Sequence, residues 1–425
     1  MNFVSTALDS LLVLITTVWV VMGPLLLFRV RHRLPPANAE GDAGLEPVSI
    51  LKPVAGIDDG LEANLRTFFS QNYPRYEVVF GVQGEEDPVL ELVRKLMREH
   101  PEVEARVVVH DGGRGINPKV SNLRAMLTTA GHDLMVVSDS NIRVHPSYLR
   151  EMQAEMARPR VGLVTSLFAG VGEKTLGALV ENAHLNATVV AGVVVPTEVL
   201  GHPIAVGKSM MFRRSLIDKI GGLESVAYTL AEDYVIGRMF HEAGFDVRLC
   251  PVPVMNVIAK STLATFCRRQ LRWNMMRLRL QPFAFLLEPL TMPLFTATVA
   301  IVLGSPPLWT LGWALGITVG RDAMQWTMMR GPRGIALALL VIPLREVLLF
   351  GTWLTTFPRR HVSWRGKRVR VSAGTRLYME TLPVTTKALF VEDRHGRLGA
   401  EGHERTSSLT RTRGSDVLRE PSPKA

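Results

Sequence analysis

Hydrophobic residues are concentrated in two zones of the chain. The first is a nearly continuous apolar run over residues 11–28, which as a helix is long enough to cross ~30 Å of hydrocarbon. Arg29, Arg31 and Arg33 follow the run directly, whereas residues 1–10 contain no Lys or Arg. We therefore predict an uncleaved anchor with an outer N-terminus, because a cleaved signal peptide needs a basic n-region and a small-residue cleavage site.

The second apolar zone covers residues 283–357. It divides into three segments, Phe283–Gly304, Pro307–Val319 and Ile335–Phe357. Arg345 and Glu346, in the last segment, are costly in lipid unless they pair or face the interior of a helix bundle. Three crossings would leave the chain outside, yet the basic residues that follow favour the inside, so the number of spans stays open. These basic residues are Arg359, Arg360, Arg365, Lys367, Arg368 and Arg370.

Between the two zones, short apolar runs alternate with amphipathic stretches. The expected strands are 48–52, 76–83, 105–109 and 134–138, and the expected helices are 61–70, 88–99 and 119–130. This alternation predicts an α/β domain with a parallel sheet covered by helices on both faces. Ligands bind beyond the carboxyl ends of such strands, and Asp87 and Asp139 follow two of these ends.

Composition narrows the class of protein. The chain has 425 residues, of which 47% are hydrophobic and 21% charged, and it has two cysteines. These values exclude a disordered chain and a small disulfide scaffold. The net charge of +10 is not accompanied by a motif that reads nucleic acid, so we expect no nucleic-acid partner. An anionic membrane surface and a phosphate-bearing substrate remain as interpretations of this charge.

The predicted organisation has five parts. They are a transmembrane anchor (1–34), an α/β domain (45–280), transmembrane or interfacial helices (283–357), a basic juxtamembrane segment (358–390) and a tail (391–425). The tail is expected to be disordered because it is polar and charged without periodicity.

The Gly-Lys-Ser stretch at residues 207–209 resembles the end of a phosphate-binding P-loop. That loop needs four residues between its first glycine and the Gly-Lys pair. Here five residues lie between Gly201 and Gly207, and one of them is Pro203. We therefore interpret the stretch as a strand or loop leading into a helix over 214–220.

Three acidic positions and one basic-aromatic motif carry the candidate chemistry. They are Asp87, Asp139, Asp233 and Arg269-Gln270-Leu271-Arg272-Trp273. Each alone has a structural interpretation, as a helix cap, a turn residue, a helix start or a juxtamembrane basic stretch. Together, carboxylates can hold a cation and accept a proton, guanidinium groups can grip phosphate, and an indole can contact a sugar or lipid. The combination suits transfer of a sugar from a nucleotide diphosphate.

The motifs resemble those of the ceramide glucosyltransferase family, membrane-bound inverting glycosyltransferases with a GT-A catalytic domain. The resemblance follows the chain in order over about residues 10–370. The matching stretches are Gly81–Pro88, Gly115–Lys119, Asp139–Val144, Gly207–Met210, Gly221–Leu223, Ala231–Tyr234, Arg269–Trp273 and Val362–Lys367.

The resemblance implies a role for each matching position. Asp233 would be the catalytic base, and Arg269, Arg272 and Trp273 would lie near the pyrophosphate and acceptor. Asn141 stands where the wider superfamily often has a second carboxylate, so a Mg²⁺ or Mn²⁺ ion would rest on Asp139 and the phosphates. Four residues are assigned to the donor: Asp87, Asp139, Lys119 and Asn122.

The implied activity is transfer of a sugar, glucose, from a UDP-sugar to the hydroxyl of a membrane lipid, ceramide, with inversion. The catalytic domain would face the cytoplasm at a bacterial inner membrane. One alternative is a hopanoid acceptor with UDP-N-acetylglucosamine as donor. A processive polysaccharide synthase and a non-enzymatic transporter or scaffold are less favoured, because the apolar segments are few and no internal repeat is present.

Overall fold

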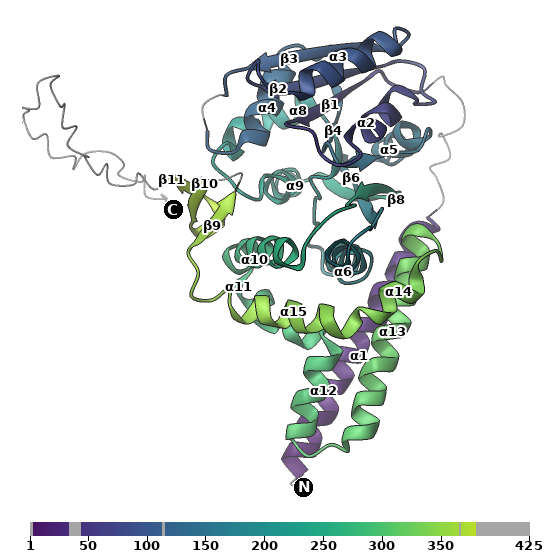
Figure 1. Ribbon diagram of the computed structural model, residues 1–425, viewed down its shortest axis with the longest axis vertical. Coiled ribbons are helices and arrows are strands. Elements are labelled where there is room, and N and C mark those ends of the chain that lie inside the picture. Colours follow the sequence, from purple (N-terminus) through teal and green to yellow (C-terminus); the bar gives the residue numbers. More distant parts are fainter. Residues whose placement is uncertain (1–2, 34–43, 113–114, 365–366, 380–425) are drawn as a thin grey trace, which may run out of the picture. The chain divides into compact units, whose positions relative to one another are not determined.

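The computed structural model describes residues 3–33, 44–112, 115–364 and 367–379 (Figure 1). The predicted tail, 391–425, lies outside these residues, as does the end of the basic segment 358–390. An α/β domain lies above a layer of helices that run across the long axis of the molecule, and a helical stalk projects from the opposite side of that layer. We call the helices of this layer, over residues 176–184, 263–280, 282–287 and 335–354, the crosswise helices.

An eight-stranded sheet forms the centre of the α/β domain, with the order β3-β2-β1-β4-β7-β6-β8-β5. The first four of these strands are parallel, as predicted. Beyond β4 the sheet is mixed, because β7 is antiparallel to both its neighbours. The strands are β1 (Val48–Val54), β2 (Tyr76–Gln83), β3 (Glu104–His110), β4 (Leu134–Ser138), β5 (Ile142–Arg143), β6 (Val161–Val171), β7 (Ser209–Arg213) and β8 (Asp246–Val257).

The reversal at β7 follows from how the chain reaches it. After β6, the chain makes a long helical excursion through α6 (Leu176–His184), a π-helical turn and α7 (Val190–Glu198) before it returns. Ser209, the first residue of β7, consequently pairs with Ser138, the last residue of β4. The residues that precede β7 therefore lie beside those that follow β4.

Side chains of the sheet alternate between two apolar cores, one on each face. Ile50 packs among α2, α3 and α5, whereas the neighbouring Leu51 packs among α4, α8 and α9. This alternation is the period of two that strand geometry imposes, and the predicted coverage of both faces is confirmed. The helices are α2 (Leu61–Arg66), α3 (Val89–Glu99), α4 (Pro118–Leu127), α5 (Tyr148–Met156), α8 (Arg214–Lys219) and α9 (Glu232–Glu242).

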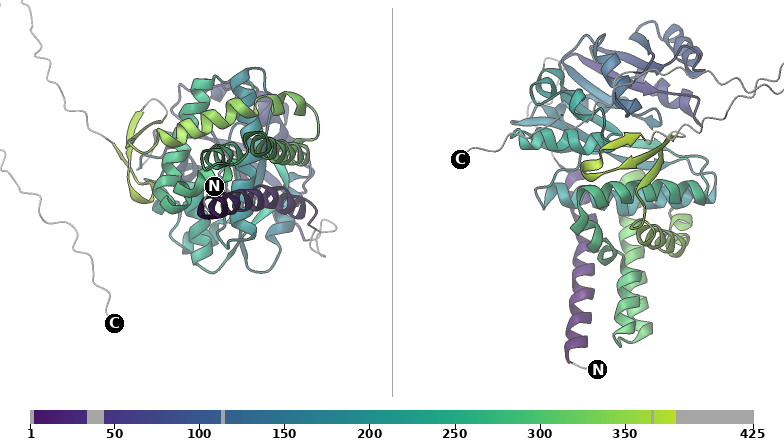
Figure 2. Two further views of the ribbon diagram at one scale, coloured as in Figure 1. Left: turned by 90° about the horizontal axis from the view of Figure 1, so that it is seen from below. Right: turned by 90° about the vertical axis from the view of Figure 1, so that its left-hand side faces the viewer.

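Three helices form the stalk (Figures 1 and 2). They are α1 (Phe3–Arg31), α12 (Pro293–Val302) and α13 (Pro307–Arg330). The hairpin of α12 and α13 packs along α1, and Ser305 at its tip donates a hydrogen bond to Asp9. The helix α13 continues beyond the predicted end at Val319, so the chain that leaves the α/β domain through α12 returns to it.

Two segments of the described residues are long and apolar enough to span a membrane, Ala7–Arg31 and Leu176–Glu198. The second is largely buried within the protein, because it consists of the α6–α7 excursion against β6. The helix α11 (Pro282–Leu287), with the 3-10 turn that follows it, forms with α12 a third candidate, bent by 77°.

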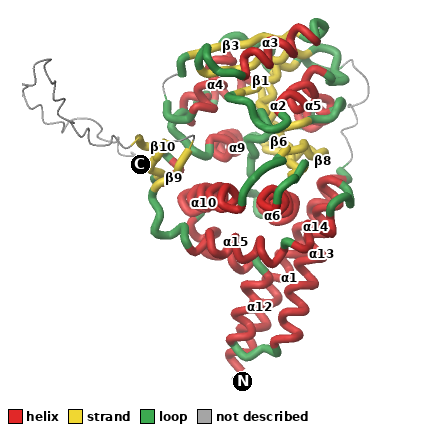
Figure 3. The backbone as a smooth tube through the Cα atoms, in the orientation of Figure 1, coloured by secondary structure: helices red, strands yellow, loops and turns green. Residues whose placement is uncertain are grey.

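The last apolar segment lies across the top of the stalk rather than along it (Figure 3). It forms α14 (Ile335–Leu340) and α15 (Ile342–Leu354), which contact α6, and α15 also contacts α10 (Leu263–Leu280). The predicted pair of Arg345 and Glu346 is confirmed, with 2.7 Å between Nη2 and Oε1. The basic segment therefore begins on the side of the α/β domain.

A small antiparallel sheet follows α15. Its strands are β9 (His361–Trp364), β10 (Lys367–Val371) and β11 (Leu377–Met379). Val369, Val371 and Leu377 pack against Leu230 and Met275. The sheet thus covers the segment that leads into α9.

Candidate active site

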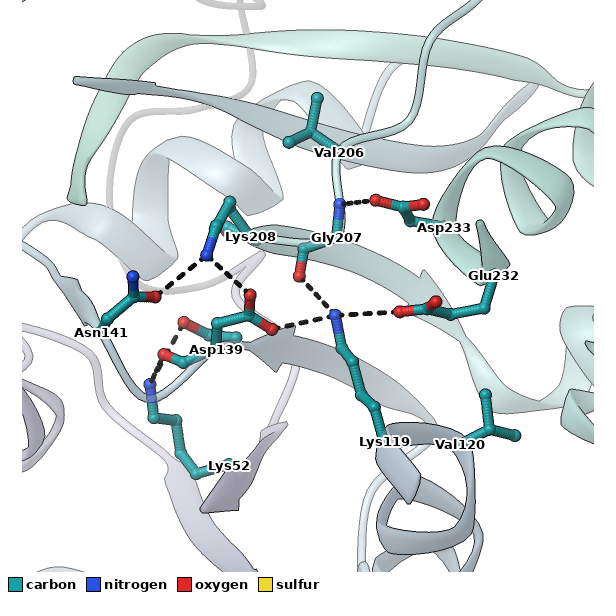
Figure 4. Close-up of polar contacts among 12 residues, drawn as sticks. Lys52, Lys119, Val120, Asp139, Asn141, Val206, Gly207, Lys208, Glu232 and Asp233 are labelled. Carbon is teal, nitrogen blue, oxygen red and sulfur yellow. Dashed lines mark hydrogen bonds and ion pairs between the residues drawn. The ribbon is translucent and has the colours of Figure 1, made fainter. Parts of the chain in front are cut away.

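Charged side chains from distant parts of the chain meet where β4 ends and β7 begins (Figure 4). The Asp139 carboxylate lies 2.9 Å from Lys119 Nζ, in the first turn of α4, and 3.0 Å from Lys208 Nζ. Lys119 Nζ also donates to Gly207 O at 2.9 Å and lies 3.3 Å from Glu232 Oε1. The antiparallel direction of β7 is what brings Lys208 to this cluster.

The cluster holds its charges in place. Burial alone would raise the pKa of Asp139, but Lys119 and Lys208 outweigh it and lower that pKa well below its usual range. Burial likewise opposes the charge of Lys119, yet the surrounding carboxylates raise its pKa. Asp139 and Lys119 are therefore both ionised at neutral pH.

A third lysine lies beneath the cluster. Lys52, on β1, donates to Asp139 O at 2.6 Å and to Ser138 Oγ at 3.3 Å, and its Nζ lies 3.8 Å from the centre of the Phe68 ring. Burial lowers the pKa of Lys52. Both of its hydrogen bonds are with residues at the end of β4, so we assign it to holding the turn that carries Asp139.

Asp233 and Glu232 open helix α9 on the other side of the cluster. Asp233 Oδ2 accepts the Gly207 N–H at 2.7 Å, and carboxylates in the first turn of a helix interact favourably with its dipole. A Cβ on Gly207 would lie 2.8 Å from that oxygen and 2.9 Å from Lys119 Nζ, so a side chain at position 207 would displace the carboxylate or the ammonium group. Burial raises the pKa of Glu232, an effect that Lys119 opposes.

The segment before α9 is held from one side by the start of α4. Asn117 Nδ2 donates to Thr229 O at 2.8 Å and to Glu232 Oε2 at 3.1 Å. The Asn117 backbone N–H donates to Ala227 O, and a Cβ on Gly115, at φ 126°, would come within 2.8 Å of that oxygen. A side chain at position 115 would therefore push the two segments apart.

The C-terminal sheet holds the same segment from the other side. Thr375 O accepts the Leu230 N–H at 3.0 Å, and Thr375 Oγ1 accepts the Ala231 N–H at 3.4 Å. Thr375 is fully buried and has a φ of 58°, a left-handed conformation that is costly for a β-branched residue. The chain tolerates this conformation at a position next to the Glu232–Asp233 pair.

The basic-aromatic motif lies on α10, below the cluster. Arg269 forms an ion pair with the fully buried Glu181 of α6. Arg272 is mostly buried, which lowers its pKa, and no ion pair or hydrogen bond joins its side chain to the rest of the described chain. Trp273 packs against the apolar core of the sheet. Arg272 is thus the guanidinium of this motif that is available to an anion.

Asp87 and Asn122 lie outside the cluster. The Asp87 carboxylate accepts the Gly56 N–H at 3.0 Å and the Val89 N–H at 2.9 Å, so it ties the loop after β1 to the start of α3. Asn122 Oδ1 is hydrogen-bonded to His110 Nε2 at the end of β3. Both residues shape the strand ends at which a nucleotide is expected.

Sequence reasoning missed three residues of the site. Lys208 lies in the Gly-Lys-Ser stretch and in the matching stretch Gly207–Met210, but neither pattern assigns a role to its side chain. Glu232 was seen only as the neighbour of Asp233. Thr375 had no sequence signal, because its role depends on a contact between segments about 140 positions apart, at Ala231 and Thr375.

The oxygen donors suit a hard cation in part. Among the residues that the structure describes, no group of three His, Cys, Asp or Glu side chains is arranged to hold a metal. Asp139 and Asn141 offer oxygens, but Lys208 Nζ contacts both, at 3.0 and 3.1 Å. Mg²⁺ is commonly held by one or two carboxylates plus substrate phosphates, so this donor set fits only with a bound diphosphate.

Comparisons with known proteins identify a family. Residues 6–377 match the model of glycosyl transferase family 21. Ceramide glucosyltransferase 1 of Caenorhabditis elegans is 28% identical over 304 residues, which cover 71% of this chain and 63% of that protein. Ceramide glucosyltransferase 3 of the same organism is 27% identical, over 62% of this chain and 56% of that protein. The chain therefore spans less than two thirds of the length of these relatives.

One solved structure that the comparison matches to this chain is the mannosyltransferase PcManGT from Pyrobaculum calidifontis in complex with GDP-Man and Mn²⁺. The match has a TM-score of 0.46 and 19% identity, and it covers 82% of this chain and 98% of the mannosyltransferase.

Proposed function

The chain belongs to glycosyl transferase family 21, and from this premise we propose that it transfers a sugar from a UDP-sugar to a hydroxyl of a membrane lipid. The proposed donor is UDP-glucose, the proposed acceptor is ceramide, and the anomeric centre is inverted. The observation that carries the proposal is the meeting of Asp139, Lys119, Lys208 and the Glu232–Asp233 pair at the strand ends, above the helices that lead to the stalk.

The donor diphosphate is assigned to the cationic side of the cluster. The ammonium groups of Lys119 and Lys208 both lie within 3.0 Å of the Asp139 carboxylate. A bound diphosphate can therefore replace this carboxylate as the acceptor of their hydrogen bonds. Arg272, which is free of a carboxylate partner in the described chain, adds a planar donor. When bound at Asp139 and Asn141, Mg²⁺ or Mn²⁺ would neutralise the leaving diphosphate.

Asp233 is the proposed general base. The Gly207 N–H fixes Oδ2 at 2.7 Å, and the Asp233 Oδ1 accepts the Tyr234 N–H at 2.8 Å, so the orientation of the carboxylate is set before substrate arrives. A preorganised carboxylate can take the proton of the attacking lipid hydroxyl as that oxygen attacks the anomeric carbon. A single displacement then inverts the configuration.

The acceptor is expected to arrive from the side of α10 and α11. The helix α10 carries Arg269 and Arg272 and runs directly into α11, whose Phe283 is 81% exposed. A lipid with long apolar chains hardly leaves a bilayer, so the site must lie at the level of its headgroup. We propose that the α/β domain faces the cytoplasm, at a bacterial inner membrane, because Arg29 and Arg31 lie in the last turn of α1 and Arg33 follows it, at the end nearest this domain.

A panel of substrates tests the proposal. Full-length protein in nanodiscs would receive UDP-glucose, UDP-galactose or UDP-N-acetylglucosamine with ceramide, diacylglycerol or a hopanoid. We expect turnover with UDP-glucose and ceramide, and a β-linked product by NMR. Transfer to the hopanoid alone, or retention of configuration, would contradict the proposed acceptor or mechanism. Absence of UDP binding would contradict the donor assignment.

A further inference from the structure

A second basic site lies away from the cluster, between the crosswise helices and the C-terminal sheet. It is a cavity of about 390 Å³. Three of its lining residues are arginines, contributed by the last turn of α10, the segment after α15, and β10. The lining residues are Arg279, Phe357, Arg360, Arg370, Val371, Ser372 and Ala373.

The three guanidinium groups lack a counter-charge. No ion pair joins Arg279, Arg360 or Arg370 to a carboxylate of the described residues, and the buried Nε of Arg279 has no hydrogen-bond partner among them. Bringing like charges to one cavity is unfavourable unless an anion neutralises them. Guanidinium groups from three segments can together surround the oxygens of a phosphate.

The position of the cavity favours a lipid as the source of that phosphate. Its apolar wall is Phe357, which packs against Phe285 of α11 with 5.7 Å between ring centres. The same layer exposes Phe283 and Val347, the latter by 68%. These exposed apolar side chains are typical of helices that lie in a membrane interface. A phosphate in the cavity would therefore lie at headgroup depth, with acyl chains beside Phe357.

The cavity also adjoins the structure that holds the active site. Ser372 and Ala373 form part of its wall and lie three and two positions before Thr375, which binds the backbone of Leu230 and Ala231. An anion that neutralises Arg360 and Arg370 would stabilise this turn. This turn also positions the start of α9, where Asp233 lies.

We propose that this cavity binds the phosphate of an anionic phospholipid, which is neither donor nor acceptor, and that the bound lipid supports turnover by stabilising the turn that ends at Thr375. The effect on turnover rests on the proposed glycosyltransferase function, whereas the binding of the lipid does not.

The binding test uses full-length protein reconstituted in phosphatidylcholine nanodiscs with and without phosphatidylglycerol. Bound phosphatidylglycerol would be counted by native mass spectrometry after release from the nanodisc. The test variant is Arg360→Gln/Arg370→Gln. The matched control is Arg359→Gln/Arg376→Gln, which removes the same charge at two positions that do not line the cavity.

We expect wild-type protein and the control to retain phosphatidylglycerol in preference to phosphatidylcholine, and the test variant to lose about tenfold in affinity. In parallel, phosphatidylglycerol should raise turnover of wild type and control but not of the test variant, with the KM for UDP-sugar unchanged.

Three results would overturn the inference. They are equal retention by test and control variants, displacement of the lipid by UDP, and equal occupancy by soluble glycerol phosphate. UDP displacement would place the cavity in the donor site, and glycerol phosphate would identify a site for free phosphates. Loss of lipid binding with ceramide glucosylation intact, and the reverse, separate failure of this inference from failure of the proposed function.

Discussion

Two clusters of the same charge composition occupy different levels of the molecule. The cluster at the strand ends combines Lys119 and Lys208 with Asp139 and Glu232. The cluster between α13 and α15 combines Arg321 and Arg345 with Asp322 and Glu346. In the first, the side chains of Lys119, Lys208 and Asp139 keep 16–24% of their surface exposed. In the second, no side chain exceeds 7%.

The difference in solvent exposure distinguishes a binding site, the open cluster, from a structural element, the closed network. A partly open ion pair can exchange its partner for a charged ligand, whereas a closed network has no route for one and instead fixes the packing of α13 against α15. Buried pairs are weak stabilisers as a whole but are strongly destabilising when broken. Charge composition alone thus does not identify an active site in this chain.

Lys119→Met tests the open cluster and gives the largest expected effect among its lysines. It removes the cation that contacts Asp139, Glu232 and Gly207 O. Loss of one preorganised electrostatic group typically lowers kcat by about 10²- to 10³-fold. Steady-state kinetics measure this, and Lys174→Met, a lysine outside the cluster, is the control. A loss below about threefold would contradict a role at the diphosphate.

Arg345→Met tests the closed network. The change leaves Asp322 and Glu346 buried with one cation fewer, which typically costs about 3–5 kcal/mol of stability. Thermal unfolding in detergent should therefore shift downwards, while kcat per folded molecule stays at the wild-type value. A selective loss of kcat without a change in unfolding would remove the distinction between the two clusters.

Asn141→Asp sharpens the account of the metal. A second carboxylate two positions after Asp139 adds a charged oxygen ligand, and the Asn256 amide, now 2.9 Å from Asn141 Nδ2, can flip to donate to it. The Mn²⁺ concentration that half-activates the enzyme should fall by about tenfold. An unchanged metal dependence would indicate that position 141 does not contribute a ligand.

Thr375→Ala has the smallest expected effect. It removes the Oγ1 acceptor of the Ala231 N–H, a bond of about 1 kcal/mol, so kcat should fall about fivefold with the KM for UDP-sugar unchanged. Thr375→Ser keeps the oxygen and should restore kcat. If both variants lose folded protein but keep kcat, Thr375 only stabilises the sheet.

Much of the α/β domain could be predicted from local pattern. The bounds of β2 and β4 follow from apolar runs, and Asp139 could be placed at a strand end from the buried run before it. The direction of β7 could not be predicted, because it depends on a helical excursion of more than thirty residues between Val171 and Ser209. Lys208 was missed for that reason.

The crosswise helices show a second limit of sequence reasoning. Hydropathy reports how apolar a segment is, but it does not report the direction of the helix relative to its neighbours. Residues 335–357 form a largely apolar segment, yet α14 and α15 lie against α6 and α15 also lies against α10. The contact of Thr375 with Ala231 cannot be predicted for a similar reason. It joins two segments that are separated in the sequence by the stalk helices α12 and α13.

The most direct test of the central claim is turnover by Asp233→Asn with UDP binding measured on the same preparation. The amide oxygen of Asn can still accept the Gly207 N–H, so the geometry of the site is kept while the base is lost. We predict that kcat falls by about 10²- to 10⁴-fold and that the affinity for UDP stays unchanged. Turnover close to the wild-type value would contradict the assignment of Asp233 as the base.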